Sequence, residues 1–224
     1  MAQRPLDEAL EFAENPEPRC PCVLVLDVSG SMKGDRIAQL NEGMHFFWEE
    51  VSQDPLACKR VEVAVVTFSD TVDIAQDFAT IENSQAPTLY AGGATAMGTA
   101  ILKALQLIRT RKETYRRNGI SYYRPWIFLI TDGEPTEPPE VMQRAAQEIQ
   151  QEEAKKGVAF FAVGVEDANM DMLATLSKER PPLKLKGLAF RELFLWLSTS
   201  MQRVSSSKVG EKVDLPPPEG WCSV

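Results

Sequence analysis

The chain of 224 residues contains a single histidine, and this shortage limits its catalytic chemistry. His45 lies within an expected helix, in the stretch Met44-His45-Phe46-Phe47-Trp48, and is interpreted as a structural or surface residue. No histidine then remains for a Ser-His-Asp or Cys-His catalytic arrangement. A G-x-x-x-x-G-K-[ST] motif is also missing, which excludes a P-loop nucleotide hydrolase.

Cysteine is scarce too, because four residues are too few for a disulfide scaffold in a chain of this length. Cys20-Pro21-Cys22 is one residue short of a C-x-x-C motif, and Cys58 and Cys222 form no second pair in the sequence. We expect reduced structural or surface thiols at all four positions. A zinc site and a Cys22–Cys222 bridge between the two ends of the chain are the alternatives.

Long apolar runs are absent. The longest is about eight residues, from Val158 to Val165, well short of the ~18 residues that cross a bilayer. The N-terminal stretch has no basic segment followed by an apolar one, so it does not resemble an export signal. The charges sum to 24 − 32 = −8, and an acidic surface repels phosphate backbones. We therefore expect a soluble, cytoplasmic protein that binds neither nucleic acid nor membrane.

Short apolar runs alternate with amphipathic stretches along the chain. The runs are typical of strands buried on both faces, and they cover residues 22–26, 61–68, 126–131 and 158–165. Apolar residues at helical spacing predict helices over about 36–52, 98–116, 140–156 and 190–203. The connection before residues 72–74 is too short for a crossover, which predicts a short antiparallel edge strand there. The pattern predicts a doubly wound α/β fold with a mostly parallel sheet and helices on both faces.

Composition changes near the carboxyl end of the chain. We interpret residues 1–19 as an N-terminal extension, 20–204 as the folded domain and 205–224 as a Ser/Pro-rich tail. Within the tail, Ser205-Ser206-Ser207 resembles a linker and Pro216-Pro217-Pro218 a stiff polyproline segment. Trp221 is expected to pack on the domain or on a partner, because a free tail rarely retains a tryptophan.

Oxygen-bearing side chains follow the expected strands, at the edge where open α/β sheets bind ligands. Asp27, Ser29 and Ser31 come directly after the first apolar run. Thr95 follows Gly92-Gly93 ahead of a helix, and Asp132 directly follows the run at 126–131. Without histidine or cysteine, such a set disfavours zinc, copper and iron. Hydroxyls with a few carboxylates suit Mg²⁺, or another hard ion such as Mn²⁺ or Ca²⁺. Each loop alone is compatible with ordinary capping and turn chemistry, but the three together favour a metal site.

These three segments, D-x-S-x-S, G-G-A-T and T-D-G, together resemble the signature of a von Willebrand factor type A (VWA) domain over about residues 20–204. The resemblance implies a Rossmann-like fold and a metal-ion-dependent adhesion site (MIDAS) formed by Asp27, Ser29, Ser31, Thr95 and Asp132. It implies direct ligation by Ser29, Ser31 and either Thr95 or Asp132, with Asp27 acting through water. The expected function is a non-enzymatic module that recruits a protein partner, whose Asp or Glu side chain completes the coordination of the ion.

Further segments are similar to the bacterial tellurium-resistance-associated TerY-like group of VWA proteins. They are residues 92–98, 130–136, 190–197 and 215–221. In that group the domain stands beside a protein kinase and a PP2C-type phosphatase. The resemblance therefore implies a signalling or stress-response assembly in a bacterium.

Two other functions compete with this interpretation. Some VWA domains dock onto an AAA+ motor, and the sequence does not exclude this role. A Mg²⁺-dependent aspartyl-phosphate phosphatase also carries an Asp after its first strand, but it needs an acidic residue two positions later, where this chain has Ser29. Separately, Arg109-Thr110-Arg111-Lys112 and Arg116-Arg117 form a small basic cluster. We interpret it as solvated surface, with an acidic or phosphorylated partner as the alternative.

Overall fold

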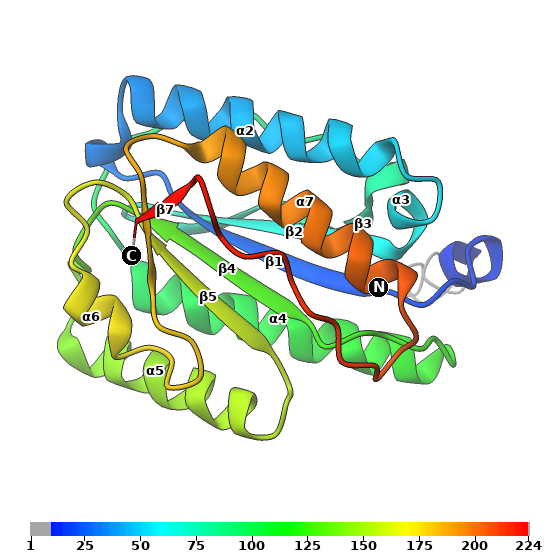
Figure 1. Ribbon diagram of the computed structural model, residues 1–224. Helices are drawn as coiled ribbons and strands as arrows, with labels where there is room; N and C mark the ends of the chain where they lie inside the picture. Colours follow the sequence, from blue (N-terminus) through cyan, green and yellow to red (C-terminus); the bar gives the residue numbers. More distant parts are fainter. Residues whose placement is uncertain (1–9, 224) are drawn as a thin grey trace.

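Four parallel strands form the centre of one twisted sheet in the computed structural model, which describes residues 10–223 (Figure 1). These are β1 (Cys20–Asp27), β2 (Val61–Phe68), β4 (Trp126–Thr131) and β5 (Ala159–Gly164). Every residue in them is buried, as expected for strands that are apolar on both faces. The sheet order is β3-β2-β1-β4-β5-β6-β7. The predicted central strands are therefore confirmed.

An antiparallel strand closes the sheet at each edge. β3 (Val72–Thr80) pairs with β2 and is longer than the predicted 72–74. At the other edge, β6 (Leu183–Leu185) is parallel to β5, and β7 (Cys222–Ser223) is antiparallel to β6. The prediction of one antiparallel edge strand is thus incomplete. A strand of two residues that follows a proline-rich stretch carries no alternating pattern by which the sequence could reveal it.

Helices cover both faces of the sheet, which confirms the doubly wound α/β fold (Figure 1). One layer contains α2 (Asp35–Ser52) and α7 (Phe190–Ser206), and the other contains α4 (Met97–Arg117) and α5 (Pro139–Ala154). Side chains of β1 alternate between the two cores: Leu24 and Leu26 belong to one, Val23 and Val25 to the other. Shorter elements complete the chain, namely η1 (Gly30–Met32), α3 (Ala57–Arg60), η2 (Ile81–Asn83) and α6 (Met170–Ala174).

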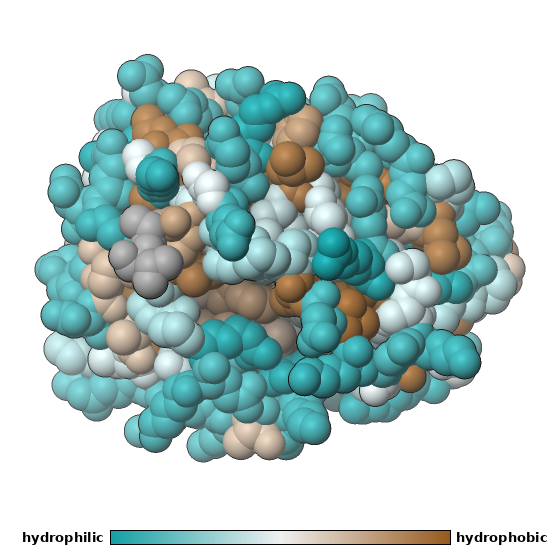
Figure 2. Space-filling view, viewed as in Figure 1, coloured by the Kyte–Doolittle hydropathy of each residue, from teal (hydrophilic) through white to brown (hydrophobic). Residues whose placement is uncertain are grey.

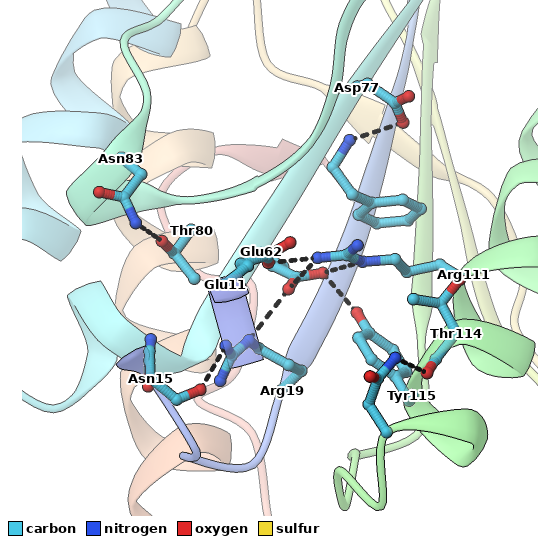
Figure 3. A network of polar contacts seen from close by, with 12 residues as sticks. Glu11, Asn15, Arg19, Glu62, Asp77, Thr80, Asn83, Arg111, Thr114 and Tyr115 are labelled. Atoms are coloured by element: carbon cyan, nitrogen blue, oxygen red, sulfur yellow. Dashed lines mark hydrogen bonds and ion pairs between the residues drawn. The ribbon is translucent and has the colours of Figure 1, made fainter. Parts of the chain in front are cut away.

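A buried ionic network lies at the end of the sheet where β1 and β2 begin (Figure 3). The Glu62 carboxylate is inaccessible to solvent and accepts hydrogen bonds from Arg19 Nε at 3.0 Å, from Arg111 Nε at 2.9 Å and from the Tyr115 hydroxyl. Arg111 also pairs with Glu11 at 2.6 Å. Arg111 was expected on solvated surface, and that expectation is wrong. Its guanidinium is needed inside because a buried carboxylate requires charged partners.

The tail packs on the domain. Ser205 and Ser206 belong to α7 rather than to a linker. The chain then returns to the sheet, where Trp221 is 1% exposed and its ring centroid lies 5.5 Å from that of Trp196. Trp196 Nε1 donates a hydrogen bond of 2.7 Å to the carbonyl oxygen of Pro216. The prediction for Trp221 is therefore confirmed. Figure 2 shows the face of the molecule that the tail crosses; this face is largely hydrophilic, with apolar side chains around a central hollow.

All four cysteines are thiols that form no disulfide within the described residues. Cys20 and Cys22 are buried in β1, so the alternative of a Cys22–Cys222 bridge is wrong. Within residues 10–223, no group of three or more His, Cys, Asp or Glu side chains is arranged to hold a metal, which leaves the zinc alternative without support. None of the helices described combines the length and the apolarity that crossing a bilayer demands.

Candidate metal-binding site

Backbone hydrogen bonds tie the three predicted loops together at the carboxyl ends of β1 and β4. The amide of Gly30 donates to Gly93 O at 2.9 Å, and the amide of Gly92 donates to Val28 O at 2.7 Å. Thr95 and Thr136 exchange two further bonds, Thr136 N to Thr95 O at 3.0 Å and Thr95 N to Thr136 Oγ1 at 3.1 Å. The loop that carries Thr95 is therefore fixed against the loops that follow both strands.

Asp27 organises the first loop from within. Its side chain is buried, Oδ1 accepts the amide of Ser29 at 2.8 Å, and Oδ2 accepts the hydroxyl of Thr131 at 2.5 Å. Burial raises the pKa of Asp27, and the charge of Asp132 acts in the same direction, whereas the hydrogen bonds from Thr131 and Ser29 oppose the rise. An aspartate held in this way fixes the turn that follows β1.

A short chain of oxygen atoms joins the first loop to the third. Ser29 Oγ lies 2.9 Å from Ser31 Oγ, which donates to Asp132 Oδ1 at 2.7 Å. Two neighbouring ligands of an octahedral Mg²⁺, each about 2.0–2.1 Å from the ion, would be about 2.9 Å apart. The spacing of these oxygen atoms therefore fits a small, hard cation.

Thr95 belongs to the same cluster, although it makes no side-chain hydrogen bond with the other four residues. A Cβ atom on Gly133 would lie 3.4 Å from Thr95 Oγ1 and 3.6 Å from Asp27 Oδ2. The hydroxyl and the carboxylate thus flank the same backbone position. The structure brings all five predicted residues, Asp27, Ser29, Ser31, Thr95 and Asp132, to one edge of the sheet.

Sequence reasoning missed the cation beside this cluster. Arg36, in the first turn of α2, donates to Asp132 Oδ2 at 2.6 Å and to the carbonyl oxygen of Ser31 at 2.9 Å. Its Nε also donates to Glu166 Oε2 at 2.5 Å. Burial disfavours the charged guanidinium, but the two carboxylates outweigh this and raise the pKa of Arg36. Nothing in the local sequence separates Arg36 from an ordinary surface arginine, because its partners are 96 and 130 residues away.

The oxygen atoms of the five side chains limit which ions the site could hold. They belong to two carboxylates and three hydroxyls, so an ion here would be coordinated by neutral hydroxyl oxygens as well as by charged carboxylates. The two oxygens of Asp132 face different partners, Oδ1 the Ser31 hydroxyl and Oδ2 the Arg36 guanidinium. An ion on the serine side would therefore leave the contact with Arg36 intact. These residues fit Mg²⁺ or another hard divalent cation.

The chain is thus a doubly wound α/β domain with hydroxyls and carboxylates at the carboxyl ends of its strands. The model of the von Willebrand factor type A domain matches residues 22–191, and the chain belongs to this family.

Curated relatives share the domain only. The chain is 28% identical to the mouse collagen alpha-4(VI) chain over 163 residues, which cover 70% of this chain and 6% of the relative. It is 26% identical to the human inter-alpha-trypsin inhibitor heavy chain H6 over 166 residues, which cover 70% of this chain and 12% of the relative. Neither relative is named as an enzyme.

Solved structures share the fold at low identity. The pilus adhesin SpaC of Lactobacillus rhamnosus GG gives a TM-score of 0.67 at 14% identity, covering 83% of this chain and 30% of that one. The ArnB paralog VWA2 of Sulfolobus acidocaldarius gives 0.56 at 18% identity, covering 82% and 45%. Proximal thread matrix protein 1 from the mussel byssus, with zinc in its MIDAS motif, gives 0.55 at 18% identity, covering 83% and 48%.

Proposed function

We propose that this chain is a non-enzymatic module that binds a protein partner through a divalent cation. The observation that carries the proposal is the convergence of Ser29, Ser31 and Asp132 oxygens at 2.9 and 2.7 Å beside the buried carboxylate of Asp27. These contacts join loops from two strands at the edge of the sheet where ligands bind in this class of fold.

The chain's own residues would divide the work. Ser29, Ser31 and either Thr95 or Asp132 would hold the ion directly, and Asp27 would act through water because its oxygens already accept bonds from Ser29 and Thr131. Two carboxylates only balance the charge of a divalent ion. A bound ion would supply an electrophilic position for an Asp or Glu side chain of the partner.

Mg²⁺ is the ion that we propose, with Mn²⁺ or Ca²⁺ as substitutes, because every side chain offered is a hard oxygen donor. The zinc held by the MIDAS motif of the mussel protein supports a divalent cation at this edge of the fold. Zinc usually prefers nitrogen and sulfur ligands, which the cluster does not offer.

The setting that we propose is a bacterial, cytoplasmic stress-response assembly linked to tellurium resistance. The TerY-like segments support it, and they imply a protein kinase and a PP2C-type phosphatase as partners. An enzymatic role is disfavoured because Ser29 stands where an aspartyl-phosphate phosphatase needs an acid.

Affinity capture from the native host tests this proposal. Wild type, Ser31→Ala and Asp132→Ala would be immobilised and compared in Mg²⁺ and in EDTA. The distant exposed serine in Ser52→Ala provides the matched control. We expect wild type and the control to retain the same partner only in Mg²⁺, and both site variants to lose it. A retained kinase or PP2C-type phosphatase would support the setting, whereas an AAA+ ATPase would favour the motor alternative. Equal retention in EDTA would contradict a cation-dependent contact.

A further inference from the structure

A second concave site lies at the opposite end of the sheet from the candidate metal site. Its volume is about 640 Å³, and it opens between the carboxyl ends of α4 and α5 and the start of β4. Two carboxylates line it, Glu113 and Glu152. Six cationic side chains line it as well, namely Arg109, Lys112, Arg116, Arg124, Lys155 and Lys156. On a chain with a net charge of −8, this is a marked local excess of positive charge.

Structural contacts fix several of these cations in place. Arg109 pairs with Glu152 at 3.2 Å, and Lys155 pairs with the same carboxylate at 3.1 Å. Lys112 Nζ donates to the carbonyl oxygen of Gly157 at 2.5 Å, and Arg124 Nε donates to that of Val158 at 2.6 Å. Cations near the carboxyl end of a helix also interact favourably with its dipole. Part of the positive charge is therefore needed by the fold itself.

Arg116 and Lys156 have no such structural contacts within the described part of the chain. Both are exposed, and among residues 10–223 neither side chain forms a hydrogen bond or an ion pair. The excess of positive charge also affects the pKa of Lys112, which lines the same concavity. Burial lowers the pKa of Lys112, and repulsion from Arg116, Lys155 and Arg109 lowers it further, against the attraction of Glu152. An anion in the concavity would relieve this repulsion.

We infer that this concavity binds the phosphoryl group of a phosphorylated protein segment. The cations converge from α4, from the turn after α5 and from the strand entry, so they favour one compact, highly charged group over an extended run of carboxylates. A phosphorylated side chain carries about −1.5 to −2 charges and three acceptor oxygens, and arginine binds such groups through paired hydrogen bonds. A nucleic acid would need a continuous basic stripe, which an acidic chain does not favour.

The position of the concavity makes it independent of the cation. Arg124 precedes β4, whereas Asp132 follows it, so the whole strand separates the two sites. Val209 and Gly210 of the tail also line the concavity. The protein would then bind one partner surface at each end of the sheet, one through a divalent ion and one through phosphate.

Nuclear magnetic resonance titration of the full chain in EDTA tests this inference. The probes would be a short phosphoserine peptide, its unphosphorylated form, the same peptide with Glu in place of phosphoserine, and inorganic phosphate. The double variant Arg116→Gln/Lys156→Gln removes the two unpaired charges. Arg203→Gln/Lys212→Gln removes two exposed charges outside the concavity and serves as the control.

We expect the phosphopeptide to give saturable shifts at residues 109–116 and 155–158, and the double variant to weaken its binding about tenfold or more through loss of two charged contacts. The control should bind as wild type does, and Asp132→Ala should leave the affinity unchanged. Equal binding of the unphosphorylated or Glu peptide would overturn the inference. So would an equal loss in both double variants, or binding of inorganic phosphate without the phosphopeptide.

Discussion

Asp132 contacts both a candidate metal ligand, Ser31, and a positively charged side chain, Arg36. Asp27 and Asp132 are two carboxylates at one edge of the sheet. Their mutual repulsion is offset without a bound ion, because Arg36 pairs with Asp132 and the Thr131 hydroxyl donates to Asp27. An incoming cation therefore shares the site with a resident positive charge. Repulsion between the Arg36 guanidinium and the ion therefore weakens the binding of the ion.

Arg36→Gln is expected to lower stability and to strengthen the response to metal. The Asp132 side chain is only 2% exposed, so loss of its charged partner should cost about 1.5–3 kcal/mol of unfolding free energy in EDTA. Mg²⁺ should then bind more tightly, since the repelling guanidinium is gone. Thermal melts with and without Mg²⁺ measure both effects, with the neighbouring exposed Lys33→Gln as control. A Mg²⁺-induced melting shift no larger than that of wild type would show that Arg36 does not repel the ion.

Gly93 is required by the loop that holds Thr95. Its φ is +88°, and an added Cβ would lie 2.3 Å from Asp70 Oδ2, the carboxylate that accepts the amide of Ala94. Gly93→Ala should therefore cost about 1–3 kcal/mol in denaturant unfolding and weaken the Mg²⁺ response. Gly92→Ala is the matched control, because a Cβ there meets nothing within 4 Å. Equal unfolding midpoints for the two variants would show that the loop tolerates a side chain at Gly93.

The thiols of β1 should be unreactive in the folded protein. Burial, aided by the charge of Glu62, raises the pKa of Cys20 to about 12, and burial also raises the pKa of Cys22. The nucleophilic thiolate is thus suppressed at both positions at neutral pH. Iodoacetamide followed by mass spectrometry should modify Cys58 and Cys222 first, and Cys20 and Cys22 only on unfolding. Rapid modification of all four thiols under native conditions would contradict the burial of β1.

The five candidate site residues could be named from the sequence because each stands directly after an apolar run or a glycine pair. Arg36 and Glu166 could not, because Arg36 reaches Asp132 and Glu166 only in the folded chain, where α2 lies beside the loops after β4 and β5. A local sequence pattern identifies the side chains that directly follow a strand. It does not identify which charged residue from a distant part of the sequence lies beside them.

At the scale of elements, uniform apolar content made β1, β2, β4 and β5 predictable, since only a strand covered on both faces tolerates it. β3 was predicted too short because its middle carries the polar side chains of an exposed edge. β7 was missed because a strand of two residues has no alternating pattern, and only its pairing with β6 defines it.

Trp221→Ala should cost about 3–5 kcal/mol of unfolding free energy, because it removes a fully buried aromatic side chain that packs on Trp196. Trp221→Phe should cost much less. Among the described residues the Trp221 indole N–H has no hydrogen-bond partner, so phenylalanine loses no such bond. Chemical denaturation of the three proteins measures the difference. Equal costs for Ala and Phe would show that Trp221 does not hold the tail by its packing.

The whole molecule has two candidate functional sites at opposite ends of one sheet. The ends differ in chemistry: hydroxyls and carboxylates at the carboxyl end of the strands, arginines and lysines at the other. The buried Glu62 network also lies at this second end and fixes residues 11–19 to the domain (Figure 3). Only the carboxyl end resembles a known site, so the central claim rests on cation binding there.

Calorimetric melting with and without Mg²⁺ tests that claim most directly. At a hundredfold excess of free ion over Kd, binding should stabilise wild type by about 2.7 kcal/mol, a melting shift of roughly 6–10 °C. Ser31→Ala is the sharpest variant, because Ser31 is an exposed residue outside both hydrophobic cores, so the loss of its hydroxyl leaves the cores intact. Asp27→Ala should also lose the shift, and it should be less stable without metal, since Ser29 N and Thr131 Oγ1 lose their acceptor. The account predicts a full shift for wild type and Ser52→Ala and none for the two site variants; an equal shift in all four proteins would show that the ion does not bind at these residues.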